Sequence, residues 1–279
     1  MNQHIVCLQQ ACDELAIPYS QIGKSPFFIN VKLAGKNNYF IGNEVPFNSA
    51  MVARICEDKA YTSELLDGLV TFPKHISFLD PDCDERYRPL VRFKNSSEIS
   101  GAILSQFELP VVLKPNRGLQ GVNIFKCEND RDIQQAIAAI FNKQSPTYDY
   151  LLLAQTYIPI EHEYRVTVFN QKIVLVYEKD FSQATFVGNL SPFHWEGTIA
   201  RVTTDPNLRH RLAAFIQPIY QRLDLMYGGL DIAVDKTGQL WLFEINTKPA
   251  YTYLVRDNGP RILVDLYKEI LQTTAAELD

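Results

Sequence analysis

The stretch that decides the fold runs from Gly228 to Ala250 and reads GGLDIAVDKTGQLWLFEINTKPA. Two apolar runs, GLDIAVD and LWLFEIN, flank a short polar turn, which is the pattern of a β-hairpin. Each apolar run nevertheless contains a carboxylate, Asp231 in the first and Glu244 in the second, and Asn246 follows two residues later. A strand pair that reads as buried therefore carries three side chains with oxygen donors.

Simple strand geometry brings these three side chains together. A turn formed by residues 236–239 pairs the two residues that flank it and places Asp231 opposite Glu244. Directly opposed residues share one face of the sheet, with Cβ atoms about 5 Å apart, and Asn246 points the same way because side chains alternate. Two like charges on one apolar face need a neutralising partner. We therefore predict a Mg²⁺ site, since carboxylate and amide oxygens suit that ion; the alternative is an exposed sheet edge.

Composition limits the class of protein. The chain has 279 residues, 46% of them hydrophobic, which is enough for one large domain or two to three small lobes. Its 27 Lys and Arg against 32 Asp and Glu give a formal net charge of −5. This acidic balance, without a run of five basic residues, argues against nucleic acid as a partner.

Membrane and redox signals are weak. No apolar run approaches the roughly 20 residues of a membrane span, and no secretory leader is visible. The five cysteines are scattered and include no C-x-x-C pair. We expect reduced, structural cysteines, no membrane association and a cytoplasmic location.

The N-terminal part predicts a small helix and two strands. Residues 1–47 contain a short helix candidate followed by two strand-like runs, with the turn between them at Gly35 and Lys36. Two short helices should follow, because Asn, Ser and Thr ahead of apolar positions are typical caps. The candidate caps are Asn48 or Ser49 for the first helix and Thr62 or Ser63 for the second.

From residue 110 onward the pattern is more regular. Apolar strands alternate with amphipathic helices, one of which Asn129 can cap. A hairpin is expected across residues 170–171, and Pro218 should kink or divide a later helix. A last helix begins at about Pro260. Strand pairs and helices mixed in this way favour an α+β architecture.

Lys114 ends the apolar strand PVVLK and precedes the glycine-containing loop PNRGLQGVN. Such an arrangement can place a cation and free backbone N–H groups against phosphates. It is not a Walker loop, because G-x-x-x-x-G-K-[ST] is absent. An ordinary loop with a solvated lysine is the alternative here, and a lysine on a helix surface is the alternative for Lys59.

The order of these motifs carries a resemblance. Lys59 is followed by LPVVLKPNRGLQGVNIF, LAQTYIPIEHEYRVTVFNQKIVLVYEK, NLSPFHWEGTIARV and GGLDIAVDKTGQLWLFEIN. Together, over roughly residues 50–250, they resemble the ATP-grasp carboxylate–amine ligases. The pattern is most similar to glutamate ligases that modify ribosomal protein tails and to the ATP-grasp parts of cyanophycin synthetase and bifunctional glutathione synthetase. It is more distantly similar to D-alanine–D-alanine ligase.

The resemblance implies an α+β ATP-grasp fold in which two α+β lobes grip ATP. We expect a short N-terminal segment at 1–47, a helical and linker region at 48–109, a lid lobe at 110–158 and a C-terminal lobe with the magnesium site at 159–279. The N-terminal segment is shorter than the α/β domain that often precedes this core in relatives.

The resemblance also implies residue roles. Two lysines would bind the nucleotide phosphates, the glycine loop would close over them, a strand between the lobes would meet the adenine, and one glutamate would bind the ribose. These residues are Lys59, Lys114, Arg117, Gly118, Gly121, Gln155, Tyr157, Ile158 and Glu163. The metal ligands would again be Asp231, Glu244 and Asn246. The acyl-phosphate side of the site would contain Arg165, Lys179, Asn189 and Arg201.

The chemistry implied is activation of a carboxylate. ATP converts it to an acyl phosphate, an amine attacks, and ADP and phosphate are released. Phosphoryl transfer needs positioning and charge neutralisation, which two Mg²⁺ ions (or Mn²⁺) and several Lys or Arg residues provide. We expect small-molecule or peptide substrates and, by analogy, a homo-oligomer.

Several residues depart from the pattern of the relatives. Lys179 replaces an arginine and loses its bidentate fork. Next to Asn189, SPFHWEG replaces a basic, glycine-rich run. The roles of three residues are open. Trp195 can shape a substrate pocket or simply pack, His194 can shape that pocket, act as a general base or have no catalytic task, and Lys248 can bind a substrate carboxylate or be solvated. Two other functions remain: a small-molecule kinase on the same ATP site, which these departures allow, and a nucleotide-binding module that a partner completes, which the short N-terminal segment allows.

Overall fold

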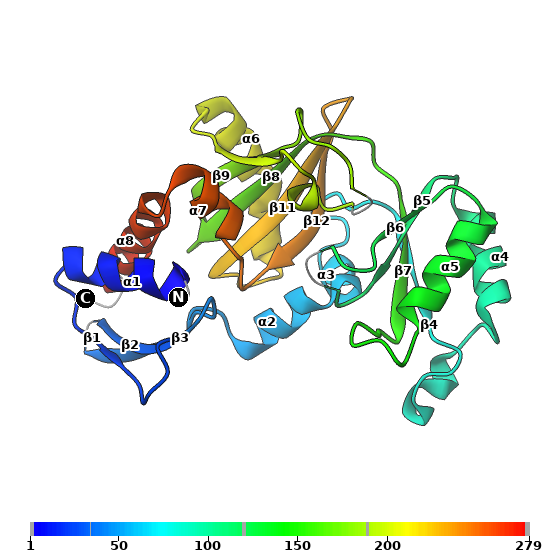
Figure 1. Ribbon diagram of the computed structural model, residues 1–279, viewed down its shortest axis with the longest axis horizontal. Coiled ribbons are helices and arrows are strands. Elements are labelled where there is room, and N and C mark those ends of the chain that lie inside the picture. The colour runs from blue at the N-terminus through cyan, green and yellow to red at the C-terminus, as the bar shows by residue number, and fades with distance from the viewer. Residues whose placement is uncertain (1–2, 34, 119–120, 188–189, 277–279) are drawn as a thin grey trace.

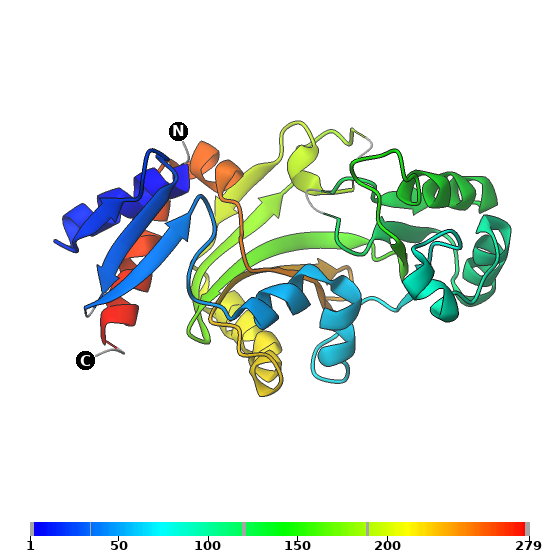
Figure 2. The ribbon, with the colours of Figure 1, turned by 90° about the horizontal axis from the view of Figure 1, so that it is seen from below.

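The computed structural model describes residues 3–33, 35–118, 121–187 and 190–276, and arranges them around three antiparallel sheets (Figure 1). In the part of the chain so described, no helix is long and apolar enough to cross a membrane. Figures 1 and 2 show the three sheets in a row, with both ends of the chain beside the first.

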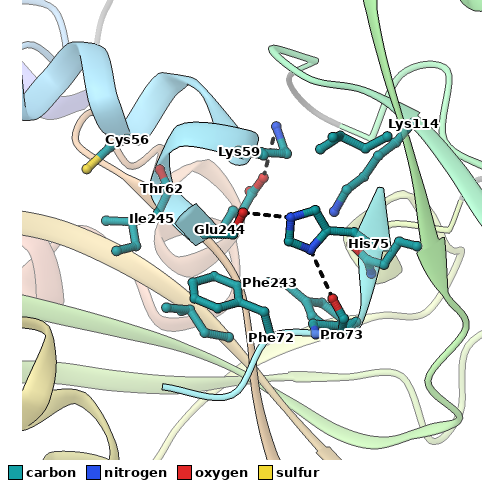
Figure 3. A pocket seen from close by; sticks show the side chains of 14 residues that line it. Cys56, Lys59, Thr62, Phe72, Pro73, His75, Lys114, Phe243, Glu244 and Ile245 are labelled. Atoms are coloured by element: carbon teal, nitrogen blue, oxygen red, sulfur yellow. Dashed lines mark hydrogen bonds and ion pairs between the residues drawn. The ribbon is translucent and has the colours of Figure 1, made fainter. Parts of the chain in front are cut away.

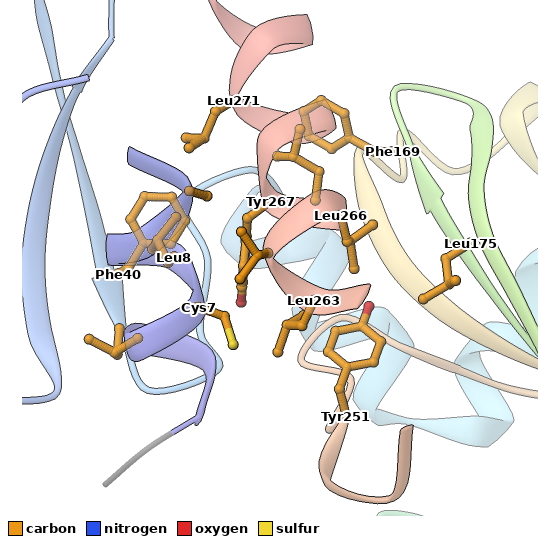
Figure 4. Close-up of a cluster of buried hydrophobic side chains, with 14 of the residues drawn as sticks. Cys7, Leu8, Phe40, Phe169, Leu175, Tyr251, Leu263, Leu266, Tyr267 and Leu271 are labelled. Atoms are coloured by element: carbon orange, nitrogen blue, oxygen red, sulfur yellow. The ribbon is translucent and has the colours of Figure 1, made fainter. Parts of the chain in front are cut away.

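The first sheet joins the two ends of the chain. Its order is β1-β2-β3, with β1 at Tyr19–Gln21, β2 at Phe28–Leu33 and β3 at Lys36–Ile41. Helix α1 (Gln3–Glu14) packs on α8 (Arg261–Ala276), and their buried side chains form one core with the sheet (Figure 4). The N-terminal segment is thus anchored by the end of the chain.

The four-stranded sheet forms a lobe of its own. Its order is β4-β7-β5-β6, and α4 and α5 lie side by side on it (Figure 1). The bounds are β4 His75–Leu79, the 3₁₀ helix η1 Glu85–Leu90, α4 Ser96–Gln106, β5 Val111–Pro115, β6 Phe125–Cys127, α5 Asp130–Ile140 and β7 Leu151–Thr156. Because β4 and α4 pack into the core of this lobe, we propose that it starts near residue 75 rather than 110.

The five-stranded sheet is the largest element. Its order is β10-β9-β8-β11-β12, with β8 at Ile160–Phe169, β9 at Lys172–Asp180, β10 at Ile199–Val202, β11 at Tyr227–Asp235 and β12 at Leu240–Asn246. Around it lie α2 Ala50–Glu57, α3 Lys59–Leu65, η2 Pro192–His194, α6 Pro206–Ile216, η3 Gln217–Gln221 and α7 Thr252–Asn258. The hairpin quoted first therefore lies at one side of this sheet.

The two faces of this sheet differ. Side chains such as Val166, Leu230 and Ile232 form a buried core with α2 and α6. On the other face, Phe169 and Tyr227 pack toward the terminal helices. The charged residues of the hairpin and of β8 lie on this second face, further along the strands. The sheet thus provides an apolar half that anchors it and a charged half that can bind ligands.

Most predicted caps and turns are confirmed. Ser49 Oγ accepts a hydrogen bond from Val52 N at 3.2 Å, and Asn129 caps α5. The turn of the β8–β9 hairpin places residues 170–171 at φ +46° and +60°, the conformation of a two-residue hairpin turn. The helix after Asp205 changes to 3₁₀ geometry at Gln217, next to Pro218.

The second helix begins earlier than predicted. Asp58, not Thr62 or Ser63, is the cap of α3, and its Oδ1 accepts from Tyr61 N at 3.1 Å. The predicted caps lie inside the helix, where Thr62 Oγ1 donates to the Ile55 carbonyl at 2.8 Å. Aspartate caps a helix as well as serine and better than threonine, and its charge is also favoured at the positive end of the helix.

The predicted pairing of Asp231 with Glu244 is confirmed, but the predicted turn and the register next to it are wrong. Leu240 pairs with Val234, not with Asp235, so the turn is one residue longer than predicted. A bulge between Asp231 and Ile232 then shifts the register back and restores the pair Asp231–Glu244. Alternation alone could not reveal a bulge, because it adds one residue to only one strand.

The cap of α3 gives a stability prediction. Asp58→Ala should lower the free energy of unfolding by about 1 kcal/mol through loss of the cap alone. Asp58→Asn retains a capping oxygen and should lose less. Urea unfolding of both variants tests this; equal losses would show that the cap contributes nothing separable.

Candidate active site

A cavity of about 780 Å³ lies over the charged half of the five-stranded sheet, and we call it the main cavity. It is bounded by β8, β9, β11 and β12 below, by α2 and α3 at one side and by the glycine loop after β5. Half of the residues assigned from sequence line it: Lys59, Arg117, Gly121, Arg165, Lys179, Asp231, Glu244 and Asn246.

A much smaller side pocket of about 20 Å³ adjoins the main cavity, since Lys59 and Glu244 line both. Figure 3 shows Lys59 and Lys114 beside Glu244 in this pocket, with the aromatic rings of Phe72 and Phe243 below them. Gln155 also lines it. The side pocket thus brings together the two lysines and β7, the strand of the four-stranded sheet that carries Gln155; their roles toward a nucleotide stay predictions.

Lys59 connects the two lobes. Its Nζ lies 3.6 Å from Glu244 Oε2 on β12 and donates to the carbonyl of Gly118 at 2.8 Å in the glycine loop. Gly118 is required there, because a Cβ would lie 2.4 Å from Pro115 Cγ. Asn116, which sequence reasoning missed, accepts a hydrogen bond from Ala60 N at 2.9 Å and so holds the start of α3 against the lid lobe.

Lys114 is buried, and burial lowers the pKa of its ammonium group to about 7; the charge of Lys59 acts in the same direction. Near neutral pH the group is therefore divided between charged and neutral forms. Phosphate oxygens placed beside it would favour the charged form. This environment suits a lysine whose partner is a ligand rather than a residue of the protein.

A buried ionic network lies on the floor of the main cavity. Arg165 Nη2 donates to Asp231 Oδ2 at 2.9 Å, and the Nε of the same arginine donates to the other oxygen. Lys179 Nζ lies 3.0 Å from Asp231 Oδ2 and donates to Glu163. Two carboxylates thus face two cations, and the side chains of all four residues are nearly inaccessible to solvent.

Burial and pairing oppose each other in this network. Burial alone would raise the pKa of Asp231, but Arg165 and Lys179 outweigh it and hold that pKa below its usual range. Burial lowers the pKa of Lys179, and Asp231 and Glu163 outweigh it, so this pKa is raised. Burial raises the pKa of Glu163. Asp231 is therefore ionised, and both cations keep their charge at the cavity floor.

The structure distinguishes among the predicted metal ligands. Asn246 Nδ2 donates to Glu244 Oε1 at 2.9 Å, and both side chains line the main cavity, with Glu244 about one-third exposed. Asp231 instead directs its oxygens to Arg165 and Lys179. Within the described ranges, no group of three His, Cys, Asp or Glu side chains gathers around one point. The donor set of Glu244 and Asn246 fits Mg²⁺ with water and phosphate oxygens completing the sphere.

Other assigned residues lie outside the main cavity. Glu163 is buried against Lys179 instead of lining it, so its ribose role stays a prediction. Arg201 is exposed and pairs with Asp180. The ring centroid of Tyr157 lies 4.9 Å from the ammonium of Lys126, and Ile158 is buried. Asn189 lies outside the described residues.

The open residues separate into two groups. Trp195 packs its ring against Phe181 and Phe186, each at 5.3 Å between centroids, which indicates packing. His194 and Lys248 line the main cavity. Lys248 Nζ lies 3.5 Å from the carboxylate of Glu57, a cavity residue at the end of α2 that no sequence motif marked.

Comparison with solved structures gives the class of fold. The chain is similar to D-alanine–D-alanine ligase from Bacillus anthracis, with a TM-score of 0.55, 19% identity, and coverage of 84% of this chain and 72% of that one. For the ATP complex of the Bacillus anthracis ligase, the TM-score is 0.52 and the identity 21%, with coverage of 81% of this chain and 69% of that one. For the D-alanine–D-alanine ligase from Coxiella burnetii, the TM-score is 0.53 and the identity 13%, with coverage of 81% of this chain and 61% of that one. At these identities the likeness establishes the ATP-grasp fold.

The family follows from the sequence itself. A family model, the RimK-like ATP-grasp domain, matches residues 90–273, about two-thirds of the chain. The protein therefore belongs to the RimK-like family of ATP-grasp proteins, and it is an ATP-dependent carboxylate–amine ligase. A search of curated proteins gave no sequence match.

The ionic network gives a second prediction. Asp231→Ala should destabilise the fold by about 3–5 kcal/mol, because it leaves two buried cations without their shared partner. The pair Asp231→Ala with Arg165→Met should be less destabilised than the single variant, since one orphaned charge is removed. Urea unfolding at pH 7 measures the stability of both variants. A double variant that is less stable than the single variant would contradict the network.

Lys114 gives a third prediction, on pH. Because its pKa is lowered to about 7, the group is mostly neutral at pH 8, and binding of Mg²⁺-ATP should take up a proton there. Affinity should fall as the pH rises above 7. Calorimetry in two buffers of different ionisation enthalpy measures the uptake, and Lys114→Met should abolish it. Binding at pH 8 without proton uptake would contradict this role of Lys114.

Proposed function

We propose that the protein uses ATP and Mg²⁺ to activate the carboxylate of one substrate as an acyl phosphate and joins it to the amine of another, releasing ADP and phosphate. The observation that carries this proposal is the main cavity, where Lys59 and Glu244 adjoin a floor with two paired cations, together with the side pocket that holds Lys114. Acyl-phosphate chemistry needs fixed positive charge and positioning, and no nucleophilic residue of the protein.

The proposed roles follow the positions of the side chains. Lys59 and Lys114 bind the phosphates beside the glycine loop, and Gln155 marks the nucleotide end at the side pocket. Arg165 and Lys179 face the acyl phosphate from the cavity floor. Their charge is held in place before substrate arrives, so little reorganisation is needed when negative charge develops.

The metal would be held by Glu244 and Asn246 at the cavity wall. Bound Mg²⁺ supplies charge neutralisation of the ATP phosphates. Two ions, with Mn²⁺ as a substitute, are the expected stoichiometry, and Asp231 would join the ligands only if its cations released one oxygen. Glu244 also pairs with Lys59, so metal, phosphate and lid contacts meet at one residue.

The substrates are proposed to be small molecules or peptides. Lys248 lies 3.3 Å from Glu44 and 3.5 Å from Glu57, and once these ion pairs open, its ammonium and the Glu57 carboxylate would complement an amino-acid-like zwitterion at the same cavity. Neither nucleic acid nor a membrane is needed as a partner, and homo-oligomers in a cytoplasmic setting remain the expectation.

Trapping with hydroxylamine tests the reaction type. Purified protein is incubated with Mg²⁺-ATP, a panel of carboxylates and hydroxylamine, and products are identified by mass spectrometry. An acyl phosphate yields a hydroxamate, and replacing hydroxylamine with amines should yield amides. A stable phosphorylated product without hydroxamate would identify a small-molecule kinase instead. Amide formation by the isolated chain would exclude the module that depends on a partner.

Glu244→Gln tests the metal site and serves as the control in that assay. Gln keeps the size but loses the charge and turns one oxygen into an NH₂ donor that cannot ligate a cation. The fold should persist, turnover should be lost, and the rise in melting temperature on adding Mg²⁺-ATP should shrink, since that rise follows ligand affinity. A variant with the full wild-type rise and turnover would exclude Glu244 as a ligand.

A further inference from the structure

A second cavity, of about 520 Å³, lies where α2 faces the lid lobe, and we call it the basic cavity. Four cations line it: Arg54 from α2, Arg86 from η1, Arg117 from the glycine loop and Lys143 from the segment after α5. The one carboxylate on its wall is Asp84. This is a local excess of positive charge in a protein whose net charge is −5.

The cations are incompletely neutralised. Arg86 pairs with Asp84 at 3.2 Å, but Arg54 lies 3.9 Å from its nearest carboxylate, Glu57. Lys143 Nζ donates to a backbone carbonyl, that of Asp82, which neutralises none of its charge and leaves two of its three N–H groups for another acceptor. The cavity therefore offers donors that the protein itself does not use.

The tyrosines make its wall rigid. Tyr87 and Tyr150 stack with ring centroids 4.8 Å apart and an interplanar angle of 8°, and the guanidinium of Arg86 lies 5.0 Å from the Tyr87 ring. Tyr148, also on the wall, donates its hydroxyl to Asp80 at 2.8 Å. Rings held in this way fix the cations beside them, which lowers the entropic cost of binding a ligand.

Arg117 stands between the two cavities and lines both. Its backbone N–H donates to Asp149 at 2.7 Å, and its Nη2 donates to the Tyr150 hydroxyl at 2.9 Å. Its Nε is buried and makes no hydrogen bond, although Asp58 Oδ2 lies 3.5 Å away. The Arg117 guanidinium is therefore held at the cavity wall by Tyr150 and paired only loosely with Asp58, which leaves part of its charge for an anion.

We propose that the basic cavity is a binding site for an anion of two or more charges, carried on carboxylate or phosphate groups. Arginine forks match the oxygens of both groups, and the donors come from separate segments that converge on one space. This site is distinct from the nucleotide site, which the lysines and Glu244 define on the other side of Arg117. The proposal stands independently of the reaction proposed above.

Calorimetry with two probes tests the site. The main cavity is first saturated with Mg²⁺ and a non-hydrolysable ATP analogue, and then tricarballylate or inorganic phosphate is titrated at pH 8. We expect binding that weakens as NaCl is raised. The double variant Arg54→Gln with Lys143→Gln should bind roughly tenfold or more weakly, the scale of one lost charge-assisted hydrogen bond.

A matched control removes the same charge elsewhere. Lys94 and Arg131 are exposed and line neither cavity, so Lys94→Gln with Arg131→Gln should leave binding unchanged. Melting temperatures and affinity for the ATP analogue check that both double variants are folded with an intact nucleotide site. Binding of tricarballylate alone would indicate a carboxylate ligand, and binding of phosphate alone a phosphorylated one. No binding of either probe, or equal weakening in the control, would overturn the proposal.

Discussion

The buried pairing of Asp231 with Arg165 and Lys179 is the constraint on which the active-site floor depends. Charges of this kind are tolerated away from water only when each meets a partner with good geometry. The partners come from three adjacent strands, β11, β8 and β9, so a slip of one residue in any strand would move one of them to the opposite face. The network thus favours one register of the sheet and, through it, the position of both cations below the main cavity.

A second set of contacts joins this sheet to the lid lobe. Lys59 reaches Glu244 on β12 and Gly118 in the glycine loop, and Asn116 accepts from the first turn of α3. Asp58, the cap of α3, also lies 3.5 Å from Arg117. The start of α3, the glycine loop and the five-stranded sheet therefore bring charged groups to one point. The phosphates of a nucleotide would add negative charge there.

These two sets of contacts explain why the site combines rigidity with room for ligand. The two cations of the floor are paired with buried carboxylates, whereas Lys114, and the Arg117 side chain between the two cavities, lack full compensation. Lysine and arginine thus serve in two ways: Lys114 and Arg117 at the wall keep donors without full partners, whereas Arg165 and Lys179 at the floor are paired with carboxylates. We propose that ligand anions bind at the wall, and that Arg165 and Lys179 in the floor lie where a reaction would develop negative charge.

The sequence by itself determined the α+β class and most of the caps and turns, because capping and turn chemistry act over a few residues. It predicted the pair Asp231–Glu244 as well, but only because a turn predicted one residue too short and an unseen bulge offset each other. It also ordered the motifs that place Lys59 and Lys114 near the hairpin. Only the tertiary structure decided that β4 and α4 join the lid lobe, that a bulge corrects the hairpin register, and that Asp231 faces two cations while Glu244 meets Lys59. Those outcomes depend on contacts between segments far apart in the chain, where burial and charge pairing are settled together, and no local pattern records them.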